Sequence, residues 1–254
     1  MIEHLRHGAI HELRLNRPPV NAFHDELLLK LVADLDSAIR EGARGIVLSG
    51  NDKVFSGGMD VPHLMSLDRK QMKQCWSRFF AAARAVAGSP VPVAAAVTGH
   101  NPAGGCVIAL CCDYRVMARS ADPAKPFRIG LNETQVGLAV PDAIQQLLRR
   151  IVGAHRAERL IVAGALIDSE RAHALGIVDE LAEPGEVTAR AIAWLQSLLV
   201  LPSAPMLATR AIARADMIAA LAAFGDRELD AFLDQWDLPD TQAALRAVME
   251  RLKK

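Results

Sequence analysis

Residues 91–118 read VPVAAAVTGHNPAGGCVIALCCDYRVMA, and this stretch decides the fold class. Residues 91–97 form an apolar run of strand length, and residues 113–118 (DYRVMA) predict a second strand. Between them, a loop at 98–102 leads into an apolar segment at 104–111 that predicts a helix. A strand, a helix and a second strand in this order indicate a crossover unit, so the chain is expected to have an α/β fold.

The same alternation extends toward the N-terminus. Residues 2–15 predict two short strands joined around Gly8, and residues 45–50 predict a buried strand that ends in glycine. Between these, residues 25–41 place their apolar side chains on one helical face and carry two acidic residues in the first turn. Asp68 is expected to cap a helix that runs to about residue 87.

From residue 141 onward the pattern is nearly all helical. Helices are predicted at 141–151 and 155–163, Asp168 is expected to cap another helix, and residues 177–181 resemble a short strand. The remainder, from about residue 202, is rich in alanine and leucine. It is expected to form helices whose apolar faces serve contacts between subunits.

The composition excludes several classes of protein. The chain has 254 residues, 51% of them hydrophobic, and its 29 basic and 29 acidic residues give zero net charge. These values exclude a disordered chain and a nucleic-acid binder with a strong electrostatic footprint. No apolar run reaches the roughly 18 to 20 residues that span a bilayer, and the N-terminus does not resemble a targeting segment. We therefore expect a cytoplasmic protein, or one that has already been processed, with no membrane partner. Zero net charge gives little repulsion between molecules and favours an oligomer.

Cysteine and histidine spacing does not indicate a metal site. The four cysteines show no Cys-x-x-Cys spacing, and the histidines form no His-Glu-x-x-His motif, so the cysteines are expected to pack in the core. His4, His7 and His11 lie in alternating sequence and are expected to face different ways.

Glycine spacing does not indicate a nucleotide site. Gly99 and Gly104 have the spacing of a phosphate loop, but Gly105 and Cys106 stand where that loop needs lysine and serine or threonine. A dinucleotide-binding Gly-x-Gly-x-x-Gly motif is absent as well. We therefore expect neither a nucleotide cofactor nor a metal.

Two glycine-rich loops remain, at residues 55–60 (FSGGMD) and 99–106 (GHNPAGGC). Each follows a predicted strand and precedes a helix or a helix-like turn. Backbone N–H groups exposed at such turns can converge on one oxygen and form an oxyanion hole. The alternative is that the glycines serve tight turns and close packing.

A third element, residues 129–141 (IGLNETQVGLAVP), contains one acid, Glu133, among apolar residues and glycines. Burial there would raise the pKa of the carboxyl group toward the value that a general base needs. The alternative is a helix cap or a solvated side chain.

Together these elements resemble the enoyl-CoA hydratase/isomerase family, also called the crotonase superfamily. The similarity covers about the first 180 residues well and the helical tail loosely. It runs in order through residues 15–22 (LNRPPVNA), 55–60, 99–106, 112–118 (CDYRVMA), Glu133 and 174–179 (ALGIVD).

The resemblance implies a spiral of ββα units over residues 1–195, a helical trimerisation region over 196–254, and a homotrimer or a dimer of trimers. It implies acyl-CoA thioester substrates, with coenzyme A as part of the substrate and no separate cofactor. By position in the motifs, the N–H groups of Met59 and Gly104 would form the oxyanion hole. The other residues expected to bind substrate are Pro19, Val20, Gly57, Gly58, Asp60, Val61 and Asn132.

Within that family the acids decide the reaction. Hydratases that resemble this chain carry one glutamate directly after Gly-Gly-Cys and a second one at the position of Glu133; here the first position is Val107. One carboxylate can shuttle a single proton between two carbons, which is the chemistry of Δ3,Δ2-enoyl-CoA isomerases. The alternatives are an enoyl-CoA hydratase, another reaction on a CoA thioester, and a non-catalytic acyl-CoA-binding protein.

Overall fold

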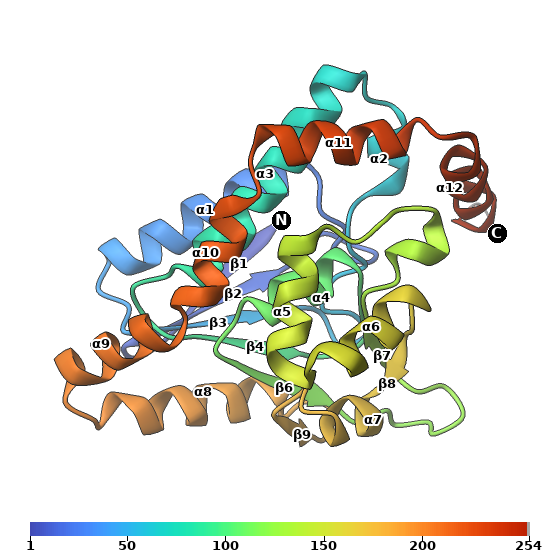
Figure 1. The fold of residues 1–254 in the computed structure, drawn as a ribbon. Coiled ribbons are helices and arrows are strands. Elements are labelled where there is room, and N and C mark those ends of the chain that lie inside the picture. The colour runs from blue at the N-terminus through green and yellow to red at the C-terminus, as the bar shows by residue number, and fades with distance from the viewer. Residues whose placement is uncertain (253–254) are drawn as a thin grey trace.

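A computed structural model describes residues 1–252 and contains one main sheet with helices on both faces (Figure 1). The two N-terminal strands pair antiparallel, and every other neighbouring pair in this sheet is parallel. The predicted α/β class is confirmed. In spatial order the strands are β1 (Ile2–His7), β2 (Ile10–Leu15), β3 (Gly45–Ser49), β4 (Val93–Val97), β6 (Tyr114–Ala118) and β9 (Glu180–Ala182).

The central strands are apolar on both sides because helices cover both sides. Even-numbered β4 residues Ala94 and Ala96 pack with α8 (Val187–Leu199), which Figure 1 shows below the sheet. The odd-numbered residues of β4 belong to the larger core cluster on the other face. That cluster includes residues of α1 (Asp25–Arg40), α3 (Arg69–Ala87) and α4 (Gly104–Leu110). Strands buried on both faces have continuous apolar sequences, as the sequence shows for 91–97.

A small second sheet was not predicted. It consists of β5 (Asn101–Pro102), β7 (Arg128–Gly130) and β8 (Ile167–Asp168), which are too short to show alternation. The predicted strand at 177–181 is displaced in the structure, where β9 spans Glu180–Ala182. The N–H groups of Ile177 and Val178 instead donate to the Ala172 carbonyl at the end of α7 (Ser169–Ala174).

The histidines near the N-terminus correct one prediction. In the β1–β2 register His4 pairs with Leu13 and His11 pairs with Arg6, so His4 and His11 share a face. Their ring nitrogens are 3.1 Å apart. His7 does lie on the opposite face, beside Glu12. Cross-strand pairing, which alternation within one strand does not reveal, brings the two rings together.

The C-terminal half is helical, as predicted. α10 (Ala215–Ala223) packs on α3 and α5 (Asp142–Val152), α11 (Asp226–Trp236) packs on α3, and α12 (Pro239–Leu252) contacts the turn at Glu133. The division at residue 195 stays a prediction, and the structure places that residue inside α8. This half also contains α6 (Ala154–Val162) and α9 (Ser203–Ala213), besides α7 and α8. Among the described residues no single helix is long and apolar enough to cross a membrane; α8 and α9, bent by 115°, meet that test only as a pair.

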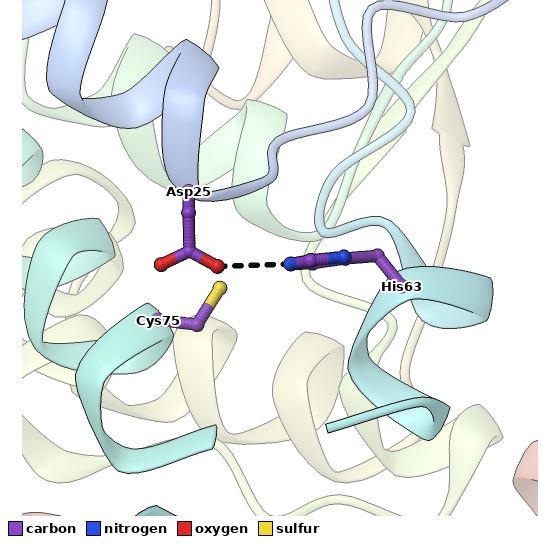
Figure 2. Close-up of side chains that lie close together, drawn as sticks. All are labelled: Asp25, His63 and Cys75. Carbon is purple, nitrogen blue, oxygen red and sulfur yellow. Dashed lines mark hydrogen bonds and ion pairs between the residues drawn. The ribbon is translucent and has the colours of Figure 1, made fainter. Parts of the chain in front are cut away.

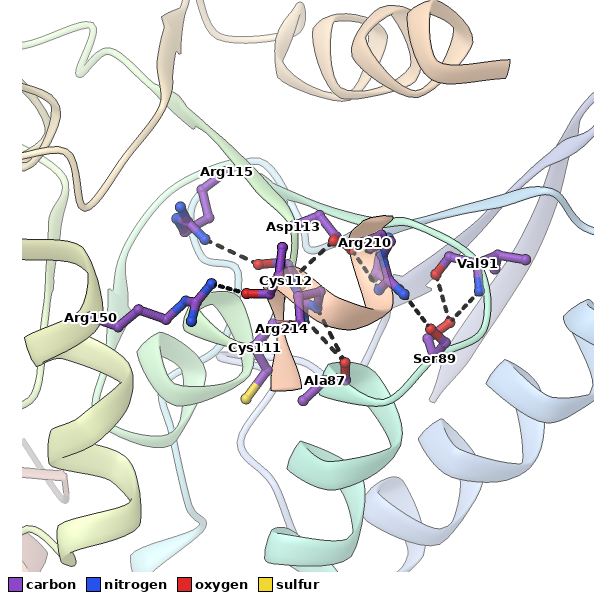
Figure 3. Close-up of polar contacts among 12 residues, drawn as sticks. Ala87, Ser89, Val91, Cys111, Cys112, Asp113, Arg115, Arg150, Arg210 and Arg214 are labelled. Carbon is purple, nitrogen blue, oxygen red and sulfur yellow. Dashed lines mark hydrogen bonds and ion pairs between the residues drawn. The ribbon is translucent and has the colours of Figure 1, made fainter. Parts of the chain in front are cut away.

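A partly buried ionic cluster connects the C-terminal helices to the core (Figure 3). Arg210 donates to both carboxylate oxygens of Asp113, at 2.8 and 2.9 Å, and Arg214 donates to the same carboxylate at 3.0 Å. Arg214 also donates to the carbonyls of Ala87 and Cys111, at the ends of α3 and α4. Guanidinium groups at helix C-termini donate to the last carbonyls, which have no partner within the helix, and their positive charge interacts favourably with the negative end of the helix dipole. The start of α10 is thereby fixed to the body of the protein.

Candidate active site

The first glycine loop is held in place by Asn21, a residue of the LNRPPVNA segment. The Asn21 side chain donates to the Phe55 carbonyl at 3.0 Å, and its backbone carbonyl accepts from the Ser56 hydroxyl at 2.8 Å. Asn21 is fully buried and has a positive φ of 52°, which asparagine tolerates better than most residues. The adjacent Pro19–Val20 turn supports Gly57, whose N–H donates to the Val20 carbonyl at 2.7 Å.

The N–H of Met59 is directed away from the strand-like bridge that its neighbours form. Phe23 pairs with Met59 in a parallel bridge, in which the Gly58 carbonyl and the Asp60 N–H bond to Phe23. In such a bridge the central residue turns its own N–H to the other side. Met59 therefore presents a donor on the side opposite Phe23.

Gly104 lies close to this loop and is the first residue of α4. The N–H groups of a helix's first turn have no partner within the helix. A Cβ added to Gly58 would lie 3.2 Å from the Gly104 nitrogen, and one added to Gly104 would lie 3.4 Å from the Gly58 Cα. The two glycine loops thus approach each other as closely as glycine allows, with the donors of Met59 and Gly104 in neighbouring positions.

Ala103, just before α4, carries backbone strain. Its φ of 47° and ψ of −123° lie in a region that side-chain-bearing residues rarely adopt. Its N–H donates to the Gly130 carbonyl at 2.8 Å, and its carbonyl accepts from Val107 at 3.0 Å. These two bonds hold the turn that aims the first N–H groups of α4.

Glu133 begins a 3-10 turn, Glu133–Val136, that other helices fix from two sides. The Thr134 hydroxyl donates to the Ile161 carbonyl of α6 at 3.3 Å, and the Thr241 hydroxyl of α12 donates to the Gly137 carbonyl at 2.6 Å. Gly137 ends the turn with a φ of 83°, and a Cβ there would lie 2.8 Å from the Thr241 Cα. Close packing of α12 therefore depends on glycine at this position.

The Glu133 carboxyl group is buried and poorly satisfied. Glu133 is 8% exposed, and its Oε2 atom has no hydrogen-bond partner among the described residues. Burial raises the pKa of Glu133 from 4.5 to about 7, against a smaller opposing effect of its own backbone N–H. A carboxyl group with a pKa near neutrality exchanges a proton readily in either direction.

Glu133 lines a cavity of about 190 Å³ whose wall is mostly apolar. Met59 and Gly104 belong to the same wall, so the three predicted catalytic residues meet at one cavity. Glu133 is the one titratable group among the described residues of this wall. The wall consists of Gly57, Met59, Val61, Leu64, Trp76, Phe79, Pro102, Ala103, Gly104, Asn132, Glu133, Val136, Leu138, Pro141, Ile144, Phe232, Trp236, Leu245 and Val248.

The other predicted binding residues divide into two groups. Gly57, Val61 and Asn132 line the cavity, and the side-chain oxygen of Asn132 is buried without a partner. The second group lies outside the cavity wall: Gly58 and Asp60 belong to the glycine loop itself, and Pro19 and Val20 belong to the turn that supports it. The carboxylate of Asp60 caps α2 (Val61–Met65) through the His63 N–H and pairs with Arg17 at 2.6 Å. A substrate-binding role for these residues stays a prediction.

Sequence reasoning missed the distal part of the cavity wall. Trp76 and Phe79 lie on the apolar face of α3, and a face of this kind predicts core packing and no cavity. α11 and α12 were predicted only as helices of a tail, yet they contribute four wall residues, namely Phe232, Trp236, Leu245 and Val248. Contacts across more than a hundred residues leave no local signal.

Asp25, His63 and Cys75 lie close together (Figure 2). The His63 Nε2 atom lies 2.8 Å from Asp25 Oδ2, and the ligand-type atoms of all three residues lie within 4.8 Å of one another. Arg78 also donates to Asp25, so a positive charge already occupies this carboxylate and opposes a cation. Burial raises the pKa of the Cys75 thiol to about 12, which disfavours the thiolate. The cluster instead fastens α2, which carries Val61 and Leu64 of the cavity wall, to α1 and α3.

The chain is similar to proteins of one known family. The family model for enoyl-CoA hydratase/isomerase matches residues 6–254. The chain is 29% identical to human mitochondrial enoyl-CoA delta isomerase 1 over 251 residues, covering 95% of this chain and 80% of the human protein. It is 31% identical over 207 residues to a protein of Mycobacterium avium named a probable enoyl-CoA hydratase, covering 81% and 78% of the two chains.

Solved structures of an isomerase and of a probable hydratase are similar to this chain as well. The crystal structure of human mitochondrial delta3-delta2-enoyl-CoA isomerase superimposes with a TM-score of 0.93 at 28% identity, covering 99% of this chain and 98% of that one. A probable enoyl-CoA hydratase from Mycobacterium tuberculosis gives a TM-score of 0.83 at 27% identity, covering 95% and 98%. The similarity to both kinds of enzyme fixes the fold and does not separate the two reactions.

Proposed function

The chain belongs to the enoyl-CoA hydratase/isomerase family, and we propose that it is a Δ3,Δ2-enoyl-CoA isomerase. The observation that carries this proposal is the single carboxyl group, Glu133, among the described residues of the cavity wall. Moving a double bond by one position needs a group that takes a proton from one carbon and returns it to another. Glu133 is buried, unpaired at Oε2 and has a pKa raised to about 7, which suits both halves of that transfer.

In the proposed mechanism the thioester carbonyl of a 3-enoyl-CoA accepts hydrogen bonds from the N–H groups of Met59 and Gly104. These donors stabilise the negative charge that develops on the oxygen when the C2 proton leaves, and one such donor is typically worth about 2.7 to 4 kcal/mol of barrier. Glu133 takes the C2 proton, forming a dienolate, and returns it at C4. The product is the conjugated 2-enoyl-CoA, with atoms and charge balanced.

The apolar wall supports this reaction over hydration. Leu138, Val136 and Ile144 lie in the same wall as Glu133 and provide no group that would hold a water molecule. Val107, at the position where related hydratases carry a second acid, is fully buried and lies outside the cavity wall. A water molecule would therefore compete poorly for the dienolate intermediate.

The test replaces Glu133 by glutamine, which keeps the shape and removes the base. We expect Glu133→Gln to lower kcat for isomerisation of 3-hexenoyl-CoA by at least about a thousandfold, within the range that general base catalysis and positioning provide. Glu12→Gln is the matched control, because it changes another buried glutamate that lies outside the cavity wall, and it should retain activity within a few-fold. An isomerase rate of Glu133→Gln within a few-fold of wild type would rule the proposal out.

The alternative function is that of an enoyl-CoA hydratase, which the similarity to the mycobacterial protein supports. Assays of wild type with both substrates separate the two. Hydration of 2-hexenoyl-CoA at a rate equal to or above isomerisation of 3-hexenoyl-CoA would favour the hydratase. Binding of acyl-CoA without turnover of either substrate would favour a non-catalytic binding protein.

We also propose that the chain assembles as a homotrimer or a dimer of trimers. In α9, all of which the structure describes, no residue is buried, and Ile212 is 79% exposed. Val200 and Leu201, which join α8 to α9, are exposed as well. An exposed apolar strip of this kind suits a subunit interface. Sedimentation analysis of the purified protein tests this, and a monomer at micromolar concentration would contradict it.

A further inference from the structure

A second hollow adjoins the Glu133 cavity. It is a surface groove of about 470 Å³ between the start of α5 and the helices α10 and α11. Pro141 and Phe232 belong to the walls of both the groove and the cavity. Phe232 is 5% exposed and packs edge to face against Trp76 of the cavity wall, with ring centres 4.8 Å apart. The two hollows therefore meet at one aromatic side chain and one proline.

The groove is lined largely by small apolar side chains. Its wall includes five alanines, together with Val140 and Phe224, and these leave room along the helices. Two acidic residues also line it, but each has a partner: Asp142 pairs with Arg149 at 3.0 Å, and the Glu228 carboxylate accepts from the Gly225 N–H at 3.1 Å. The groove thus offers a largely apolar surface, with no basic side chain among the described residues of its wall that could bind phosphate.

The Glu133 cavity is the smaller of the two hollows, at about 190 Å³ against about 470 Å³ for the groove. The thioester and the carbons beside Glu133 use part of the cavity. The groove is the apolar space that shares a wall with it, so it is the space into which the far end of a long chain would extend.

The position of the groove also fits the distal end of a chain. None of the residues expected to bind the CoA portion, such as Pro19, Val20 or Gly57, belongs to the groove wall. The thioester end is set by Met59 and Gly104 on the glycine loops, whereas Phe232 and Pro141 belong to the helical wall. A chain that enters beside the loops would reach Phe232 with its far end.

We propose that Phe232 is the gate through which long acyl chains pass from the Glu133 cavity into the groove between α5, α10 and α11. Turning the Phe232 ring away from Trp76 joins the two hollows. This proposal rests on the proposed function for its substrate class. It makes the enzyme one for medium and long acyl chains, with Phe232 as a residue that determines chain length.

Ala220→Trp tests the proposal by filling the groove without altering the cavity. Ala220 is half-buried, lines the groove and lies outside the cavity wall. Ala222→Trp, an exposed position on the same helix α10 that lies outside the groove wall, is the matched control. Binding of two saturated acyl-CoAs, hexanoyl-CoA and dodecanoyl-CoA, is measured by calorimetry, so the result does not depend on turnover. Each buried methylene contributes to binding, so a blocked groove should affect the long ligand alone.

We expect Ala220→Trp to weaken dodecanoyl-CoA binding at least about tenfold and hexanoyl-CoA binding less than about twofold, with Ala222→Trp changing neither. Phe232→Leu, which keeps an apolar side chain but removes the ring, should strengthen binding of dodecanoyl-CoA relative to hexanoyl-CoA. Equal effects of Ala220→Trp on both ligands, or no effect on either, would overturn the groove assignment.

Turnover separates this proposal from the function on which it rests. If wild type isomerises neither 3-hexenoyl-CoA nor 3-dodecenoyl-CoA, the proposed function fails, while a selective loss of dodecanoyl-CoA binding in Ala220→Trp still supports the groove. If wild type isomerises both and Ala220→Trp lowers kcat/KM for the two equally, the function stands and the groove assignment fails.

Discussion

Glu12 and Glu133 are both buried glutamates, yet their surroundings differ completely. The Glu12 carboxylate accepts from the Ser49 hydroxyl at 2.6 Å and from Arg14 at 3.0 Å, and it lies 2.9 Å from His7. Although burial alone would raise its pKa, the hydrogen bonds of Ser49 and His7 and the charge of Arg14 hold the pKa of Glu12 below its usual value. Glu133 has no such partners, and burial raises its pKa to about 7.

The difference shows that burial by itself does not make a carboxyl group reactive. Glu12 is less exposed than Glu133, but three partners stabilise its charged form, so its role is structural. Glu133 is left without a partner at Oε2 inside a hollow where a substrate carbon can reach it. The absence of partners costs stability, which is a common property of functional sites.

The largest effect expected from this contrast is on how the free energy of unfolding depends on pH. Because the folded protein raises the pKa of Glu133 from 4.5 to about 7, it binds a proton in this range that the unfolded chain has lost. The free energy of unfolding should therefore fall as pH rises from 4.5 to 7, by about 3 kcal/mol for this group. Glu133→Gln removes this loss, so the variant should match wild type near pH 4.5 and exceed it by about 3 kcal/mol at pH 8. Urea denaturation at both pH values measures this.

Glu12→Gln should show the opposite sign in the same experiment. The pKa of Glu12 is lowered on folding, so its charged form contributes stability above the unfolded pKa and loses it as pH falls through the folded value. Glu12→Gln should be less stable than wild type at pH 7, with a gap that closes in acid. If the two glutamine variants changed stability in the same direction at neutral pH, the contrast between the two sites would be wrong.

A smaller effect is expected on the rate. Glu133 must be ionised to accept the C2 proton, so kcat/KM for 3-hexenoyl-CoA should rise about tenfold per pH unit below about 7 and level off above it. Glu12→Gln should keep the same midpoint, because Glu12 lies outside the cavity wall. A profile that stays flat between about pH 5.5 and 8.5 would contradict a base with this pKa.

Local signals predicted most of the main sheet and its helices. Asp68 does cap α3, with its side chain bonded to the Gln71 N–H and the Gln71 side chain bonded back, which is a capping box visible in sequence. Glu133 was found because it stands as one acid in an apolar stretch punctuated by glycine. The strand at β9 was misplaced because Ile177 and Val178 are buried through contact with α7 and not through strand pairing.

Non-local packing was beyond prediction for a physical reason. The Phe232 ring meets Trp76 although 156 positions separate them, and nothing in either helix specifies that encounter. Likewise, the partners that make Glu12 structural come from the strands β1, β2 and β3. Alternation in β2 alone would place Glu12 among solvent-facing polar residues. Whether a buried acid is paired depends on these contacts, which the tertiary fold sets.

The smallest expected effect isolates one of those contacts. Ser49→Ala removes the hydroxyl that donates to Glu12, and both groups are fully buried. We expect a loss of about 1 to 3 kcal/mol in the free energy of unfolding at pH 7, because an acceptor of a buried carboxylate is left unsatisfied. The loss should shrink as Glu12 is protonated in acid, since the hydroxyl stabilises mainly the charged form. Urea denaturation at pH 7 and in acid measures both values.

Ser37→Ala supplies the matched control, because Ser37 also donates to a glutamate, Glu41, at 2.9 Å but in an exposed position on α1. There water replaces the lost partner and alanine favours the helix, so the change in stability should stay within about 0.5 kcal/mol. Equal losses in Ser37→Ala and Ser49→Ala would mean that burial adds nothing to the hydrogen bond of Glu12. The stabilisation of Glu12 would then come from Arg14 and His7, and removing charge at Arg14 would become the decisive change.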